Sequence, residues 1–341
     1  MRAFFVALLG LFTAISATNA QEAGPKVVTD IAPVGALVAM VLGDEEGVSV
    51  LLPENASVHS FSLRPSQARN LQRADAVIWI GPSLSPWLER SIENLAPDAI
   101  SVPLISVPNT LKLIIREDIG FIEHEHHGDH DEDHEDAAHD EGLHNEDAEE
   151  DHEGEGHEED DDHDNMINAA TADPHAWLEP NNAVVWLDEI AHVLGEIRPE
   201  FREIYPANAQ VAAGKIMITA AGISEKLADV REIPFLLAHD GTQYFEHAFG
   251  VAAQAAIRDV NDATPSVRRL HDLGQQLEDA PVSCVMLDNE SGYKEITLPS
   301  GEMPDRFGTL RSMGQGQTFG PDLYIAMLND VADTFVTCLK P

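Results

Sequence analysis

Residues 26–52 read KVVTDIAPVGALVAMVLGDEEGVSVLL. The stretch opens with the short apolar run Val27–Thr29, continues with helical spacing over Val34–Leu42, and closes with a second apolar run, Val48–Leu52. The apolar runs are continuous and do not alternate with polar residues, which is typical of parallel strands covered by helices on both faces. This stretch therefore predicts the beginning of a layered α/β fold.

The same alternation of short apolar runs and helical segments continues along the chain. Further strands are predicted at Ala76–Ile80, Pro234–Ala238, Val251–Ala256 and Val282–Leu287. Further helices are predicted at Pro65–Arg73, Leu84–Leu95, Ala183–Ile197, Ser266–Leu277 and Asp322–Cys338. Between the two halves lies an unusually long helical pattern, 206–230, which spans over about 30 Å at 1.5 Å per residue. We therefore expect two doubly wound α/β lobes, 21–205 and 231–341, joined by a rigid helix over 206–230.

The first twenty residues have the pattern of a secretory signal peptide. Arg2 supplies a positive charge, Phe4–Phe12 is apolar, and Thr18-Asn19-Ala20 offers small residues for cleavage. The apolar run is short for a membrane span, and no later segment is apolar enough to cross a bilayer. We expect residues 1–20 to be removed on export, which leaves a protein with no stable membrane insertion.

An acidic and histidine-rich segment interrupts the first lobe at about 117–168. Between Glu123 and Asp164 the chain carries ten histidines and 23 carboxylates in 42 residues, without Lys or Arg. Such a stretch cannot form a packed core, but it supplies the imidazole and carboxylate ligands that Zn²⁺ prefers. The candidate ligands in this insert are His124, His126, His127, His130, His134, His139, His144, His152, His157 and His163.

The net charge favours cations as partners. Of the formal charge of −40, the segment Glu123–Asp164 accounts for −23, and the remaining −17 still makes the chain acidic. An acidic surface argues against binding to nucleic acid or to an anionic membrane. We expect a monomer that attracts metal ions.

Three histidines outside the insert occupy similar connecting segments. His59 and His239 each follow an apolar strand, and His175 lies in a turn that leads into a helix. Ligands of open α/β sheets bind at the carboxyl ends of the strands, where such connections lie. Three neutral imidazoles converging there would bind Zn²⁺ and leave a fourth position open.

The chain has two cysteines, Cys284 and Cys338. In an exported protein an even count favours a disulfide, which would close a loop of roughly 54 residues and stabilise the fold by ~3–4 kcal/mol. A pair of cysteine metal ligands is the alternative.

Three motifs in this order resemble those of the zinc-binding proteins of ABC importers, the ZnuA type within cluster A-I. They are Ser57-Val58-His59-Ser60-Phe61-Ser62-Leu63-Arg64-Pro65-Ser66, Asp173-Pro174-His175-Ala176-Trp177-Leu178, and His239-Asp240 followed by Tyr244-Phe245. The resemblance covers essentially the whole mature chain, including the insert ahead of the second motif and the two cysteines, which the family typically pairs. It implies two α/β lobes joined by a long helix, with the metal in the cleft between them.

By this resemblance the metal ligands are His59, His175 and His239. A histidine at the third position implies Zn²⁺ and not Mn²⁺, in agreement with the preference of imidazole for zinc. Two carboxylates found in some relatives are replaced here, by Val58 and by Arg311, and neither can ligate a cation. We expect water as the fourth ligand, with Asp288, Glu290 or a carboxylate from the insert as alternatives. Asp240 is the candidate for orienting an imidazole, or else a helix N-cap.

The resemblance implies a periplasmic protein that captures Zn²⁺ and delivers it to an inner-membrane ABC permease with its cytoplasmic ATPase. The insert would hold additional zinc weakly and raise its local concentration. Two other functions remain open from the residues alone. One is a zinc hydrolase, because three histidines and a water also form catalytic zinc sites. The other is a metal buffer or chaperone that acts through the insert.

Overall fold

The computed structural model of the chain describes residues 24–54, 56–58, 61–116, 168–279, 281–288 and 306–340. The predicted signal peptide, nearly all of the insert, His59 and Glu290 lie outside these residues. So do all ten histidines of the insert. Predictions on those segments therefore remain predictions.

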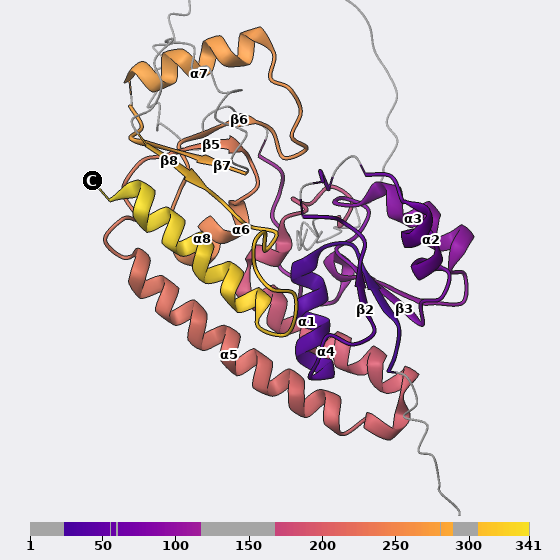
Figure 1. Cartoon of the computed structure of the whole chain (residues 1–341). Coiled ribbons are helices and arrows are strands. Elements are labelled where there is room, and N and C mark those ends of the chain that lie inside the picture. The colour runs from indigo at the N-terminus through magenta and orange to yellow at the C-terminus, as the bar shows by residue number, and fades with distance from the viewer. Residues whose placement is uncertain are drawn as a thin grey trace, which may run out of the picture.

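The first lobe is built on a four-stranded parallel sheet with the strand order β2-β1-β3-β4 (Figure 1). Its elements in chain order are β1 (Val27–Thr29), α1 (Ala32–Leu42), β2 (Val48–Val50), α2 (Pro65–Leu71), β3 (Ala76–Trp79), α3 (Pro86–Leu95) and β4 (Ile100–Pro103). Neighbouring residues of one strand face opposite sides of the sheet: Val27 belongs to the inner core, whereas Val28 packs with Leu71 and Leu88 of α2 and α3. Burial on both faces explains the continuous apolar runs.

The second lobe repeats this plan with the strand order β6-β5-β7-β8, again all parallel. Its elements are β5 (Leu236–His239), α6 (Gln243–Phe249), β6 (Ala255–Arg258), α7 (Val267–Asp279), β7 (Cys284–Leu287), β8 (Arg306–Thr309) and α8 (Leu323–Leu339). Helix α7 covers the outer face of this sheet, where Leu273 packs against Leu236 and Val285 (Figure 1).

Two long helices connect the lobes. A 3₁₀ turn at Ala176–Leu178 leads into α4 (Pro180–Ile197), and a second turn at Pro199–Phe201 leads into α5 (Ile204–Leu227). Helix α5 has 24 residues, which corresponds to about 36 Å. It runs along both lobes and packs on α1 and α4 of the first lobe and on α8 of the second (Figure 1). Among the described residues, no helix is both long and apolar enough to cross a membrane.

A single apolar core passes from one lobe to the other. It includes Val27 and Leu37 of the first lobe, Ile216 of α5, and Leu237 and Met327 of the second lobe, all fully buried. The outer faces of the two sheets have separate, smaller cores. The two sheets are thus held in one relative orientation by shared packing, and the two-lobed α/β prediction is confirmed.

Four elements differ from the predicted pattern. Strands β4 and β8 and the short helix α6 were not predicted, and β6 is Ala255–Arg258 where Val251–Ala256 was expected. Strands β4 and β8 are the edges of their sheets. They read ISVP and RFGT, and the Ser, Pro and Gly in these short runs weaken the strand pattern.

Cys284 in β7 and Cys338 in α8 form a disulfide. This contact confirms the pairing that the resemblance implied and excludes these cysteines as metal ligands. It fastens the last helix to a central strand of the second lobe.

In the first lobe, a buried carboxylate fastens the ends of β1 and β3 to each other. Asp30 is fully buried directly after β1, and its carboxylate accepts hydrogen bonds from the backbone of Ile31 and Ile80 and from the hydroxyl of Ser85. Burial, the largest effect, raises the pKa of Asp30 to about 6 against the opposing effect of these hydrogen bonds. The Asp30 carboxylate therefore binds its proton more tightly in the folded lobe than in the unfolded chain.

This difference makes the stability depend on pH. Between about pH 4 and pH 6 the unfolded chain has released the Asp30 proton and the folded chain has not, so the free energy of unfolding should fall as the pH rises, by up to about 3 kcal/mol. Asp30→Asn carries no charge at any pH and should lack this contribution. Urea unfolding of both proteins at pH 4.5 and 6.5 measures it, and parallel pH profiles would contradict the assignment.

Candidate metal centre

The sequence-predicted histidine His239 and the carboxylate Asp288 lie where the winding of the second sheet reverses. In the order β6-β5-β7-β8, the chain winds outward in opposite directions from the neighbours β5 and β7. His239 is the last residue of β5, and Asp288 directly follows β7. Ligands of open α/β sheets bind in the crevice outside the carboxyl ends at such a switch point.

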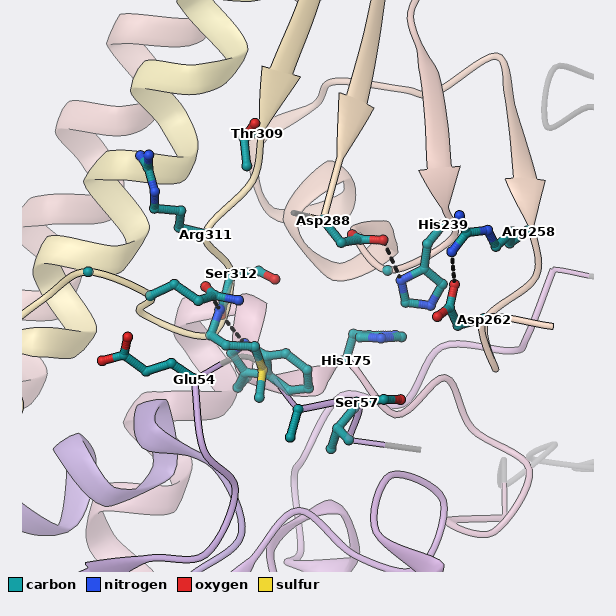
Figure 2. A pocket seen from close by; sticks show the side chains of 17 residues that line it. Glu54, Ser57, His175, His239, Arg258, Asp262, Asp288, Thr309, Arg311 and Ser312 are labelled. Atoms are coloured by element: carbon teal, nitrogen blue, oxygen red, sulfur yellow. Dashed lines mark hydrogen bonds and ion pairs between the residues drawn. The ribbon is translucent and has the colours of Figure 1, made fainter. Parts of the chain in front are cut away.

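A cavity of about 620 Å³ opens at these strand ends, between the two lobes (Figure 2). The first lobe contributes the loop after β2, including Ser57 and Val58, and the second lobe contributes the carboxyl ends of all four strands. The second-lobe residues that line it include His239, Arg258, Asp262, Asp288, Thr309 and Arg311. His175 and Trp177, from the segment ahead of α4, complete the wall.

His175 is held by a buried carboxylate two residues earlier. Asp173 Oδ1 accepts the backbone N–H of His175 at 2.8 Å and lies 2.9 Å from its Nδ1. Asp173 is itself held by Leu113 and by the hydroxyl of Tyr244, both of which bond its backbone. Because an ionised carboxylate only accepts, Nδ1 of His175 carries the proton that it shares with Asp173.

His239 has the opposite arrangement of its ring nitrogens. Its Nε2 lies 3.1 Å from the carbonyl oxygen of Val260, and its Nδ1 lies 3.3 Å from Oδ2 of Asp288 (Figure 2). Since a carbonyl can only accept, Nε2 is the donor, and Nδ1 is the nitrogen that faces the cavity wall. Burial disfavours the imidazolium, but the hydrogen bond to Asp288 and the charge of that residue outweigh it and raise the pKa of His239 to about 9.

The two imidazoles face one small volume. Their ring centroids are 5.0 Å apart, with the planes at 67°. A Cβ atom on Gly241 would lie 3.0 Å from Nδ1 of His239 and 3.3 Å from Nε2 of His175. Nδ1 of His239 and Nε2 of His175 therefore both lie next to the same space, which is open because residue 241 has no side chain.

The third predicted imidazole, His59, is outside the described residues. Within the described part of the chain, no three His, Cys, Asp or Glu side chains are grouped closely enough to hold a metal ion. Val58, the residue ahead of His59, lines the cavity on the side of the first lobe. Arg311 also lines it, and its guanidinium lies 3.6 Å from Asp330 of α8.

Asp240 does not have the expected partner. Its carboxylate accepts hydrogen bonds from Arg116, and Arg116 also binds Glu246 of α6. Helix α6 begins after Thr242, so Asp240 is not its N-cap either. The negative charge of Asp240, the residue next to His239, is thereby neutralised by Arg116 from the first lobe. Asp173 and the carbonyl of Val260 take the orienting roles instead.

Neither orienting group was predicted. Asp173 could have been found, because an Asp two residues ahead of a residue commonly accepts a backbone hydrogen bond in a turn. The Val260 carbonyl leaves no signal in the sequence, since any residue type has a carbonyl.

Comparisons with known proteins agree on one family. A family model described as "ZnuA: Zinc-uptake complex component A periplasmic" matches residues 27–338. The high-affinity zinc uptake system protein ZnuA of Paracoccus denitrificans is 34% identical over 327 residues, covering 95% of this chain and 94% of that protein.

Solved structures show the same fold at lower sequence identity. A zinc-bound deletion mutant of ZnuA has a TM-score of 0.66 at 17% identity, with 93% of this chain and 99% of that chain covered. The periplasmic zinc-binding protein TroA of Treponema pallidum has a TM-score of 0.69 at 15% identity, with 93% and 100% covered. At these identities the likeness establishes the two-lobed architecture.

Gly241→Ala tests whether the space between the imidazoles receives a metal ion. The added methyl group would occupy that space, so we expect zinc affinity to fall at least tenfold, about 1.4 kcal/mol. The control is Gly222→Ala on α5, where a Cβ would meet nothing within 4 Å. Competition with a chelating dye measures both, and equal zinc affinity in the two variants would contradict the assignment.

Proposed function

Because this chain belongs to the ZnuA family of periplasmic zinc-uptake components, we propose that it captures Zn²⁺ between its lobes and delivers it to an ABC permease. The observation that carries the proposal is the convergence of His175 Nε2 and His239 Nδ1 on the space above Gly241. Two oriented imidazoles in a cavity lined by both lobes form the core of a zinc site.

His59 is proposed as the third ligand. It follows Val58, which lines the same cavity from the first lobe. Ligands from both lobes would let the ion itself hold the two lobes together. Release to a permease would then require only that one lobe's ligand withdraw.

The location and the partners follow from the same proposal. A leader of the secretory type at 1–20 supports export to the periplasm. There the protein would meet an inner-membrane permease, with its cytoplasmic ATPase, and act as a monomer. The insert, at a formal charge of −23 over Glu123–Asp164, would concentrate zinc close to the cavity, because its first and last residues adjoin the segments that carry Arg116 and His175.

The proposal is binding and not catalysis. A catalytic zinc site keeps one position open for water. Here the carboxylate of Asp288 lies next to the proposed metal position, because its Oδ2 is 3.3 Å from Nδ1 of His239. This arrangement favours retention of an ion over activation of a water molecule.

Zinc affinity should fall with falling pH. Zinc needs the lone pair of His239 Nδ1, and with a pKa of about 9 this imidazole holds a proton at pH 7.5 that the ion must displace. Each displaced proton weakens binding about tenfold per pH unit below the pKa. Titrations at pH 7.5 and pH 5, with calorimetry in two buffers of different ionisation enthalpy, measure the affinity and the proton release. Equal affinity at both pH values would contradict the proposed site.

Deleting Glu123–Asp164 separates the proposed function from a buffer that works through the insert. We expect the shortened protein to retain one tightly bound zinc ion, because the cavity residues are untouched. Loss of nearly all zinc binding would favour the buffer. The zinc-loaded shortened protein should also leave ester and amide probes intact, whereas their turnover would favour a hydrolase.

A further inference from the structure

Two tyrosine hydroxyls of the second lobe bind the backbone on either side of His175. Tyr244 of α6 donates to the carbonyl of Asp173 at 3.0 Å, and Tyr324 of α8 donates to the carbonyl of Trp177 at 2.8 Å. Each accepting residue is two positions from His175 along the chain. The turn that carries this imidazole is therefore attached to the second lobe at both of its ends.

We propose that Tyr244 and Tyr324 are positioning residues, which hold His175 in a fixed place relative to His239. The two imidazoles would then form one half-site that is already arranged before zinc binds. This inference rests on the proposed function and assigns to it two residues that touch neither the ion nor its ligands' rings.

Burial makes the two hydroxyls effective in this role. The side chains of both Tyr244 and Tyr324 are fully buried. A buried carbonyl that loses its hydrogen-bond donor carries a large free-energy penalty, because bulk water does not reach it. Each hydroxyl therefore restricts where the backbone on its side of His175 can lie.

Trp177 adds a third attachment to the second lobe. Its indole Nε1 donates to the carbonyl of Ser312, in the segment between β8 and α8, at 2.8 Å. The ring of Trp177 is itself close to that of His175, with the centroids 5.3 Å apart. Fixing the backbone and the indole of Trp177 thus also limits the space in which the imidazole can turn.

The chain segment beside the His175 turn is held by the same helix of the second lobe. The Tyr244 hydroxyl accepts the backbone N–H of Leu113 at 3.0 Å, and the Leu113 carbonyl accepts the N–H of Asp173 at 2.9 Å. Gln243, the first residue of α6, donates to the carbonyl of Ile114 at 3.1 Å. Tyr244, Leu113 and Asp173 therefore close a ring of three hydrogen bonds at the base of the turn.

This network controls the imidazole through Asp173. The same Asp173 carboxylate oxygen bonds both the backbone N–H and the Nδ1 of His175, so any shift of Asp173 displaces the ring. The fixed ring lies with its centroid 5.0 Å from that of His239. Groups held in place before binding lose less conformational entropy when a ligand arrives, which raises affinity.

The test removes one hydroxyl at a time from the full chain. Tyr244→Phe and Tyr324→Phe keep the buried ring, and we expect each folded variant to bind zinc at least fivefold more weakly, because His175 must then be ordered by the ion. The matched control is Tyr205→Phe, at a buried tyrosine of α5 that packs against Phe201, which should change the affinity less than twofold. Competition with a chelating dye measures all three, with folding checked by near-ultraviolet circular dichroism.

Nitrogen NMR of the imidazoles in the zinc-free protein separates positioning from stability. The Nδ1–H resonance of His175 should shift or broaden in Tyr244→Phe and Tyr324→Phe and stay unchanged in Tyr205→Phe. A wild-type resonance together with wild-type zinc affinity in both variants would overturn the inference, even if urea unfolding showed that they are less stable, and would leave the proposed function intact. Failure of the wild-type chain to retain tightly bound zinc would instead overturn the proposed function itself.

Discussion

The apolar core shared by the two lobes is the constraint on which the site depends. Side chains from β1, α1, α5, β5 and α8 belong to one continuous buried cluster, so the two parallel sheets cannot turn independently without exposing it. Burying this much apolar surface is the dominant favourable term in folding. Because the shared core fixes the two lobes relative to each other, the carboxyl ends of the second sheet and the loop after β2 line one cavity.

Several buried charged groups near that cavity have a partner of opposite charge or a hydrogen-bond partner. Asp173 holds His175, and Arg116 binds Asp240 and Glu246 across the two halves of the chain. Unpaired buried charges would cost several kcal/mol each, so these contacts are needed for the polar site to exist at all. Asp173 also fixes the orientation of the His175 ring, as the Val260 carbonyl does for His239.

Much of the architecture could be predicted from short-range patterns. The strands β1, β3 and β7 and the helices α1, α5 and α8 have long or continuous apolar patterns, and each lies within a few residues of its predicted place. The edge strands β4 and β8 and the helix α6 escaped prediction because they are short and their residues pack through contacts distant in sequence. Local propensity is weak evidence for such elements.

By itself, the sequence determined the chemistry available to this protein: imidazoles in strand-end connections, a surplus of carboxylates, and two cysteines. Its order of apolar runs and helical segments predicted the two lobes, its even cysteine count favoured a disulfide, and the family motifs agreed with both. Only the tertiary structure decided which atoms meet. Nε2 of His239 donates to a carbonyl 21 residues away, which leaves Nδ1 toward Asp288. Asp240 accepts from Arg116, 124 residues away. Lone-pair direction depends on hydrogen bonds between distant segments, and no local pattern of residues encodes those.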